Sequence, residues 1–297
     1  MTSSTHAGFI SIIGQPNVGK STLLNALLGR KVSITSRKPQ TTRHRLLGIK
    51  TVESTQMIFV DTPGFQLGFK RALNRVMNKN VKIALKDVDA ILFVIEALYW
   101  NKRDEAVLKL LRNTQAPVIL VVNKIDKIKL RETLLPFIQS LQEKFSFKAI
   151  IPISAKNHTQ LEVLEKMLLT LMPEGPFLYE PHQMTDRDER FLASEIIREK
   201  VMRQTGEEVP YSTNIMIEQF EQDGSLLRIS AVIWVEKDGQ KAIMIGEKGE
   251  KLKRIGTDAR KELEKLLGQK IFLQLWVKVK SGWSDNPSLI SQLGYDR

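Results

Sequence analysis

The chain of 297 residues is 42% hydrophobic and 26% charged, which is typical of one or two soluble globular domains. It has no cysteine, and this excludes disulfides, thiolate metal sites and thiol nucleophiles, while its four histidines are scattered and indicate no metal cage. The net charge of +12 comes from residues 1–182, and residues 237–280 form a second basic cluster, so a polyanionic partner is favoured over a merely solvated basic surface.

The N-terminal residues Met1–Ala7 contain no basic cluster followed by an apolar core. No apolar run approaches the roughly 18 residues of a membrane span. We therefore expect neither a secretory signal nor a spanning helix, and a cytoplasmic location is the simplest interpretation.

Short apolar runs alternate with amphipathic stretches from Gly8 to about Met172. Nearly continuous apolar strands separated by helices predict a doubly wound α/β domain, with a parallel sheet covered on both faces. The expected strands are Phe9–Ile13, Met57–Val60, Ala90–Ile95, Val118–Val122 and Ala149–Ile153. The expected helices include Leu23–Leu28, Ala106–Leu111, Leu134–Leu141 and Leu161–Leu171.

The pattern changes after a stretch rich in proline, which can continue neither a helix nor a central strand. We predict a first domain over 1–172, a linker over 173–182, a second, smaller α+β domain over 183–284 and a loosely held tail over 285–297. The second domain has the expected order α-β-β-α-α-β, with Asp186 as the first helix's N-cap. Its elements are expected at Asp186–Arg203, Asn214–Phe220, Leu226–Glu236, Gln240–Ile245, Glu250–Leu267 and Ile271–Lys280.

The first expected strand runs directly into a match to G-x-x-x-x-G-K-[ST], in the strand–loop–helix context that a P-loop requires. Such a loop wraps a polyphosphate with backbone N–H groups and with the N-terminus of the next helix. Lys20 adds a charge for the β- and γ-phosphates, and the Ser21 hydroxyl suits Mg²⁺. The alternative, a glycine-rich turn with a surface lysine, is disfavoured by this context. The predicted nucleotide-binding residues are Gly14, Gln15, Pro16, Asn17, Val18, Gly19, Lys20, Ser21 and Thr22.

The next expected strand ends in a carboxylate, at the sheet edge where open α/β sheets bind ligands. Asp61 can orient Mg²⁺ through water, and the amide of Gly64 can approach the γ-phosphate. Taken alone, this element could equally be a tight Pro-Gly turn. We include Asp61, Thr62, Pro63, Gly64 and Phe65 in the nucleotide site.

Two later strand ends carry a candidate base-recognition site. Asp126 can accept two hydrogen bonds from guanine, which adenine cannot offer, and a buried polar site of this kind strongly penalises the wrong base. The stem of Lys124 can lie along the base, and the backbone after the last strand can meet guanine O6. The residues are Asn123, Lys124 and Asp126, then Ser154, Ala155 and Lys156.

With these motifs in this order, residues 8–172 resemble a translation-factor-type GTPase domain. The whole chain is similar to the Era family of bacterial ribosome-assembly GTPases, which joins such a domain to a C-terminal type II KH domain. The resemblance implies a mobile switch at 40–44, whose threonine reaches Mg²⁺ only in the GTP state. We assign this role to Thr42, with Thr41 as the less favoured choice. The predicted catalytic residues are Lys20, Thr42 and Gly64, and the predicted Mg²⁺ ligands are Ser21, Thr42 and Asp61.

Phe65 departs from the Ras-like pattern, in which a glutamine orients the attacking water. Phenylalanine cannot do this, so turnover is slow or another group supplies the missing function. Asn17 resembles the loop asparagine that coordinates K⁺ in several GTPases with this substitution. We therefore hypothesise a slow GTPase stimulated by K⁺.

The sequence Gly246-Glu247-Lys248-Gly249 matches the GxxG loop of a KH domain. A lone match has little value, but its position between two helices in the α-β-β-α-α-β order favours a groove for about four unstacked bases. The alternative is a small domain that uses the same apolar residues only as core, and we expect Trp234 and Trp276 to pack rather than stack on bases. The predicted RNA-binding residues are Ile243, Ile245, Gly246, Glu247, Lys248, Gly249 and Lys251.

The resemblance also specifies partners that composition and spacing do not show. It implies binding to the 3′ end of small-subunit rRNA, assistance to assembly of the small ribosomal subunit, and partial peripheral association with the cytoplasmic face of the inner membrane. We expect a monomer that binds GTP and GDP. The alternative is a nucleotide-sensing scaffold with negligible hydrolysis that works through membrane or protein partners. Asp126 disfavours an ATP-dependent enzyme.

Overall fold

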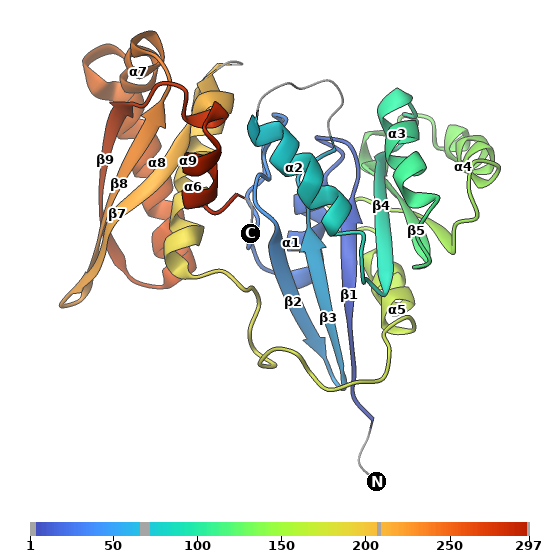
Figure 1. Ribbon diagram of the computed structural model, residues 1–297. Helices are drawn as coiled ribbons and strands as arrows, with labels where there is room; N and C mark the ends of the chain where they lie inside the picture. Colours follow the sequence, from blue (N-terminus) through green and yellow to red (C-terminus); the bar gives the residue numbers. More distant parts are fainter. Residues whose placement is uncertain (1–3, 66–71, 207–208, 296–297) are drawn as a thin grey trace. The chain divides into compact units, whose positions relative to one another are not determined.

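The computed structural model describes residues 4–65, 72–206 and 209–295 (Figure 1). They fall into two compact units. The first unit comprises Met1–Thr35, Thr42–Asp186 and Gly294–Arg297, and the second comprises Ser36–Thr41 and Arg187–Leu293. The predicted domain bounds follow the same broad division but remain a prediction.

The first unit is built on a six-stranded sheet of order β2-β3-β1-β4-β5-β6. All neighbouring strands are parallel except β2, which runs antiparallel to β3. The bounds are β1 His6–Ile13, β2 Leu46–Val52, β3 Thr55–Asp61, β4 Ala90–Glu96, β5 Val118–Asn123 and β6 Ala149–Pro152. The five expected strands are present, and the antiparallel β2 is an addition to the expected parallel sheet.

Helices cover both faces of this sheet (Figure 1). Their bounds are α1 Lys20–Leu28, α2 Ala72–Ile83, α3 Lys102–Leu111, α4 Leu134–Gln142 and α5 Leu161–Leu169. Strand β4 is fully buried from Ala90 to Ile95, as its unbroken apolar run predicts. The parallel strands therefore end together at one sheet edge, where the motif residues lie.

The second unit has a three-stranded sheet of order β7-β8-β9, in which β7 and β8 are antiparallel and β8 and β9 parallel. Its elements follow the expected α-β-β-α-α-β order. The bounds are α6 Glu189–Gln204, β7 Asn214–Asp223, β8 Leu226–Val235, α7 Asp238–Ile245, α8 Glu250–Leu267 and β9 Lys270–Val279. Alternate residues of β8 and β9 pack with α6 and α8 in one apolar core.

The cap of α6 differs from the expectation. Asp188 is the N-cap, because its Oδ1 accepts a hydrogen bond from the amide of Phe191 at 2.7 Å. Asp186 instead accepts a hydrogen bond from the amide of Leu47, at the start of β2, at 3.0 Å. The predicted cap was therefore wrong by two residues, since Asp186 helps to hold the edge strand.

The expectation of a loosely held tail is also wrong. Trp283 is fully buried, and its indole donates a hydrogen bond to the carbonyl of Ser212 at 3.0 Å. The short helix α9, Pro287–Gln292, follows and is capped by Asn286. Tyr295 is 1% exposed. The buried Tyr295 ring therefore holds the tail near its end, and Trp283 anchors the residues just before the tail.

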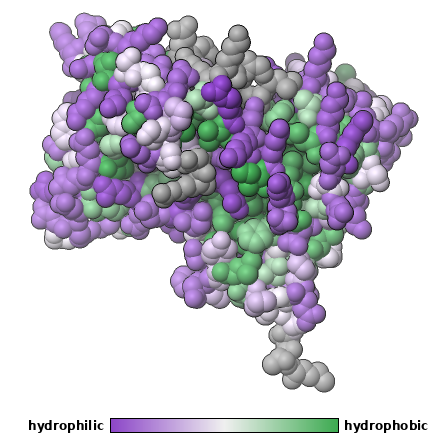
Figure 2. Space-filling view, viewed as in Figure 1, coloured by the Kyte–Doolittle hydropathy of each residue, from purple (hydrophilic) through white to green (hydrophobic). Residues whose placement is uncertain are grey.

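Figure 2 shows hydrophilic side chains over most of the face in view, with apolar patches between them. Within the part of the chain that the structure describes, no helix combines the length and apolarity required to cross a membrane.

Candidate functional site

The P-loop between β1 and α1 is shaped by two glycines. A Cβ on Gly14 would lie 2.3 Å from the carbonyl oxygen of Val94, and a Cβ on Gly19 would lie 2.4 Å from Nδ2 of Asn123. Gly19 also has a φ of 101°, which L side chains rarely adopt. The loop can therefore close against the ends of β4 and β5 only with glycine at both positions.

The loop also encloses the ammonium group of Lys20. Its Nζ donates to the carbonyls of Gly14 at 3.1 Å and Gln15 at 3.0 Å, and the residue is 6% exposed. Burial lowers the pKa of Lys20 from 10.5 to about 8, and the charge of Asp61 offsets only part of that effect. An anionic phosphate placed beside this ammonium would restore its charged form.

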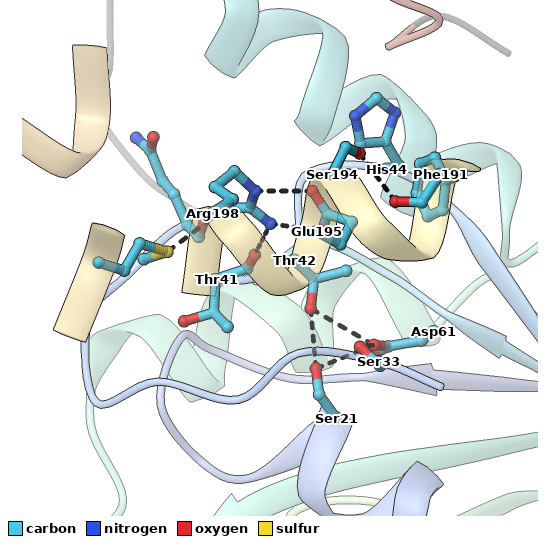
Figure 3. Close-up of polar contacts among 12 residues, drawn as sticks. Ser21, Ser33, Thr41, Thr42, His44, Asp61, Phe191, Ser194, Glu195 and Arg198 are labelled. Carbon is cyan, nitrogen blue, oxygen red and sulfur yellow. Dashed lines mark hydrogen bonds and ion pairs between the residues drawn. The ribbon is translucent and has the colours of Figure 1, made fainter. Parts of the chain in front are cut away.

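Asp61, at the end of β3, is the centre of a buried hydroxyl cluster (Figure 3). Its Oδ2 accepts from Ser21 Oγ at 2.9 Å, Ser33 Oγ at 2.9 Å and Thr42 Oγ1 at 3.3 Å. The hydroxyls of Ser21 and Thr42 are 2.8 Å apart. The P-loop helix, the segment after it and the switch segment thus each direct a hydroxyl oxygen toward the Asp61 carboxylate.

This cluster fits a magnesium ion. Asp61 Oδ1 is buried and has no hydrogen-bond partner among the described residues. Burial raises the pKa of Asp61, although the nearby Lys20 and the three hydroxyls oppose this effect. Oxygen ligands and one carboxylate are the donor set that Mg²⁺ prefers, and a cation here would offset the cost of burying the carboxylate.

The geometry distinguishes the two switch threonines. Thr42 lies in the Asp61 cluster, whereas Thr41 donates its hydroxyl to the carbonyl of Lys38 at 2.6 Å. Ser33 was not predicted, because no motif marks it. Its role becomes visible only when the fold brings it to Asp61.

Gly64 lies tightly against the P-loop. A Cβ there would be 2.8 Å from the backbone nitrogen of Pro16, and the amide of Phe65 donates to the carbonyl of Gly14 at 3.3 Å. Thr62 anchors the same turn by donating to the carbonyl of Ile12 at 2.9 Å. The Phe65 ring is partly buried against the apolar core beside β4 and contributes no polar group.

Asn123, at the end of β5, connects the P-loop to the candidate base site. Its Nδ2 donates to the carbonyl of Val18 at 2.8 Å, and its Oδ1 accepts from the amide of Ala155 at 3.0 Å. Asp126 accepts from the hydroxyl of Ser154 at 2.6 Å. Four of the predicted base-site residues therefore form two hydrogen-bonded pairs, each joining the end of β5 to the segment after β6, and Lys156 follows them on the surface.

Two acidic residues near the nucleotide site were missed. Glu96, at the end of β4, forms ion pairs with Lys124 at 2.5 Å and Lys127 at 3.1 Å. Asp104 is buried and accepts from Nε2 of Gln15 at 3.1 Å. Burial raises the pKa of Asp104 to about 6. Glu96 could have been predicted, because it is a carboxylate directly after the expected strand 90–95, at the sheet edge where the other motif residues lie.

The GxxG loop of the second unit lies between α7 and α8. Gly246, Lys248 and Gly249 have φ values of 74°, 47° and 80°, so three of the four loop residues have a positive φ. The side chain of Lys248 is exposed and that of Lys251 half-buried. The bend exposes the start of α8, where backbone N–H groups can meet a phosphate.

The apolar residues beside the loop divide between surface and core. Ile243 is 47% exposed, whereas Ile245 packs against the core and Ile255 is fully buried. Trp276 packs only in part, because the residue is 44% exposed and alternates with Leu275 and Val277, which face the core. Trp234 is half-buried beneath the ammonium of Lys280.

Comparisons with known proteins agree with both units. A family model described as a 50S ribosome-binding GTPase matches residues 9–124, and a KH-domain model matches residues 208–284. GTPase Era of Coxiella burnetii (strain Dugway 5J108-111) is 55% identical over 98% of this chain and 99% of that protein. GTPase Era of Stenotrophomonas maltophilia (strain K279a) is 52% identical over 98% of each chain.

Two solved structures share the whole fold. A crystal structure of an Aquifex aeolicus Era variant bound to GDP·AlF₄⁻ superposes with a TM-score of 0.94 at 42% identity, covering 99% of this chain and 100% of that one. A crystal structure of Era with MgGDPNP and nucleotides 1506–1542 of 16S ribosomal RNA gives the same TM-score of 0.94, 42% identity and the same coverage, 99% and 100%. Identity above one half with curated relatives, over almost the full length, shows that this chain belongs to the Era family of GTPases.

Proposed function

We propose that this chain is a Mg²⁺-dependent GTPase switch that binds single-stranded RNA from the 3′ end of 16S rRNA and assists assembly of the small ribosomal subunit. The observation that carries the nucleotide half is the cluster of Ser21 and Thr42 around Asp61, whose orphaned Oδ1 lies in a buried site. The RNA half rests on the GxxG loop and on the relative solved with MgGDPNP and 16S rRNA.

Each residue of the site has a distinct role in this proposal. Ser21, Thr42 and Asp61 would hold Mg²⁺, which when bound neutralises charge on the phosphate oxygens. Lys20 places its ammonium against the β- and γ-phosphates, and the amide of Gly64 donates to the γ-phosphate. Asp126 accepts from the guanine N1–H and amino group, while the backbone of residues 154–156 meets O6.

Phe65 has no polar group that could orient the attacking water, as the glutamine of Ras-like proteins does. We therefore expect slow intrinsic hydrolysis, with K⁺ bound through Asn17 as the source of additional charge. Asn17 itself is left-handed, with a φ of 68°, as a loop that curves around a ligand requires. The basic charge of residues 1–182 is compatible with a peripheral contact of a cytoplasmic monomer with an anionic inner membrane.

Single-turnover hydrolysis of GTP tests this function. We expect a slow rate that rises severalfold in K⁺ relative to Na⁺, and rises again with an oligonucleotide from the 3′ end of 16S rRNA. Equal rates in K⁺ and Na⁺ would remove the ion from the proposal. Tight GTP binding with no hydrolysis under any of these conditions would favour the alternative, a nucleotide-sensing scaffold.

A further inference from the structure

The last described residues of the chain return to the first unit. Gly294 and Tyr295 belong to that unit, although the residues before them, 187–293, belong to the second. Tyr295 is among the largest fully buried side chains, with 1% of its surface exposed. The matched KH-domain model ends at residue 284, before this segment begins.

Contacts with the described residues His44 and Asn80 help to hold these two residues. The ring of Tyr295 stacks on the ring of His44, with centroids 4.1 Å apart and planes inclined by 16°. Nδ1 of His44 lies 3.3 Å from the carbonyl oxygen of Gly294. The carbonyl oxygen of Tyr295 accepts a hydrogen bond at 2.9 Å from Nδ2 of Asn80, a buried residue of α2.

These contacts involve the two chain segments that directly follow residues of the Asp61 cluster. His44 is two residues beyond Thr42, whose hydroxyl lies on Ser21 and Asp61. Helix α2 is the first described element after the Asp61–Gly64 turn. Only one residue separates Thr42 from His44, and planar peptide bonds limit how far the two can move apart. Fixing the ring of His44 therefore restricts the positions that the Thr42 hydroxyl can take.

We propose that Tyr295 is a positioning residue for the nucleotide switch. Docking of Gly294 and Tyr295 holds the 42–44 segment in the arrangement that presents Thr42 to the metal, and it therefore favours Mg²⁺–GTP over GDP. The inference rests on the proposed function, in which Thr42 is a Mg²⁺ ligand. By linkage, binding of Mg²⁺–GTP favours docking of the tail by the same factor.

Equilibrium binding of MgGTPγS and of GDP to the full chain tests the proposal. Losing the stack in Tyr295→Ala should weaken MgGTPγS binding about tenfold, as expected for one aromatic pair, and change GDP binding less than about twofold. Tyr295→Phe keeps the ring and should therefore retain most of the MgGTPγS affinity that Tyr295→Ala loses. Gln292→Ala, an exposed position of the same tail, is the matched control.

A double-mutant cycle distinguishes positioning from general support of the fold. In the Thr42→Ala background, Tyr295→Ala should cause no further loss of MgGTPγS affinity, because its effect passes through Thr42. Equal losses for MgGTPγS and GDP, or no loss for either, would overturn the proposal. If Thr42→Ala itself left MgGTPγS affinity unchanged, the assignment of Thr42 as a ligand would fail, and with it this inference.

The stack can also be followed directly. The ring protons of His44 should be shielded by the Tyr295 ring in the MgGTPγS complex and should move downfield in Tyr295→Ala but not in Tyr295→Phe. Identical His44 shifts in the MgGTPγS and GDP complexes, with unchanged line widths, would show that docking does not respond to the nucleotide and would contradict the linkage.

Discussion

At the scale of single residues, the nucleotide site without its ligand holds two charges that burial opposes. Desolvation lowers the pKa of Lys20 and raises the pKa of Asp61, and their mutual attraction offsets this only in part. A polyphosphate with Mg²⁺ brings the opposite charge to each group. The burial that disfavours these two charges therefore also strengthens their electrostatic interactions with a bound polyphosphate and Mg²⁺.

Nucleotide binding should therefore take up a proton at Lys20. With a pKa of about 8 in the free protein, roughly half of the Lys20 side chains are neutral at pH 8, and a bound phosphate returns them to the charged form. Calorimetry of GDP binding at pH 8, in two buffers of different ionisation enthalpy, measures this uptake. Lys20→Arg keeps a permanent charge and should remove most of the uptake. Equal uptake in both proteins would assign the proton to another group.

Asp104 should make stability depend on pH. Its folded pKa of about 6 lies above the ordinary value of 3.8, so its contribution to folding stability is fully present below about pH 4 and is lost as pH rises through 6. Asp104→Asn removes this loss and keeps an oxygen acceptor for Gln15. The melting temperature of the variant relative to wild type should be a few degrees higher at pH 7 than at pH 5. Glu132→Gln, at an exposed position, should show no such difference.

At the scale of elements, local patterns predicted most of the fold. Continuous apolar runs identified β4 and β5, a turn signal between two strands identified β7 and β8, and a period of two identified β9. Strand β2 was missed, because it follows a basic loop and is stabilised by a non-local contact. A Cβ on its Gly48 would lie 2.6 Å from the Leu24 side chain of α1. Helix α2 was missed although Leu73, Met77 and Val81 have helical spacing.

The residues of the candidate site likewise fall into those that the sequence predicts and those that only the fold reveals. The P-loop and the strand-end motifs were predictable, because each is contiguous in sequence and its chemistry follows from residue type and order. Ser33 and Tyr295 were not predictable, since each acquires its partner only through folding. Ser33 is 28 residues from Asp61, and the contact between His44 and Gly294 spans 250 residues.

Helix α6 of the second unit holds the segment Ser36–Thr41 through a buried arginine. Arg198 donates to the carbonyls of Gln40 and Thr41, and Glu195 fixes its guanidinium with contacts of 2.7 and 2.6 Å (Figure 3). A planar donor held by a carboxylate can anchor two carbonyls without losing much side-chain entropy. The segment that precedes Thr42 is thus fixed through its backbone.

Removing this anchor should expose the segment to protease. We expect Arg198→Met combined with Glu195→Gln, which avoids an isolated buried charge, to increase trypsin cleavage after the exposed Arg37 severalfold. Arg190→Met is a matched control, because Arg190 lies on the same helix but donates to the carbonyls of Ile217 and Glu218. Similar cleavage in both variants, with unchanged melting temperatures, would show that Arg198 does not hold the segment.

At the scale of the whole molecule, the two units have separate apolar cores. The P-loop and the Asp61 cluster are built on one core, and the GxxG loop is supported by the other. A change at the GxxG loop that leaves its own core intact should therefore leave nucleotide affinity unchanged when no RNA is present. RNA binding and nucleotide binding can therefore be separated by a substitution in the GxxG loop, at a glycine whose surroundings leave room for a side chain.

Gly249 is that position, since a Cβ there would meet nothing within 4 Å. Its φ of 80° is tolerated by asparagine and aspartate among the L residues, so both variants should fold. Gly249→Asp adds a negative charge where phosphate should approach, and we expect RNA affinity to fall at least tenfold more than in the isosteric Gly249→Asn. GDP affinity should be unchanged in both. Equal RNA affinity of the two variants at low salt would exclude this loop as the phosphate contact, because only charge distinguishes them.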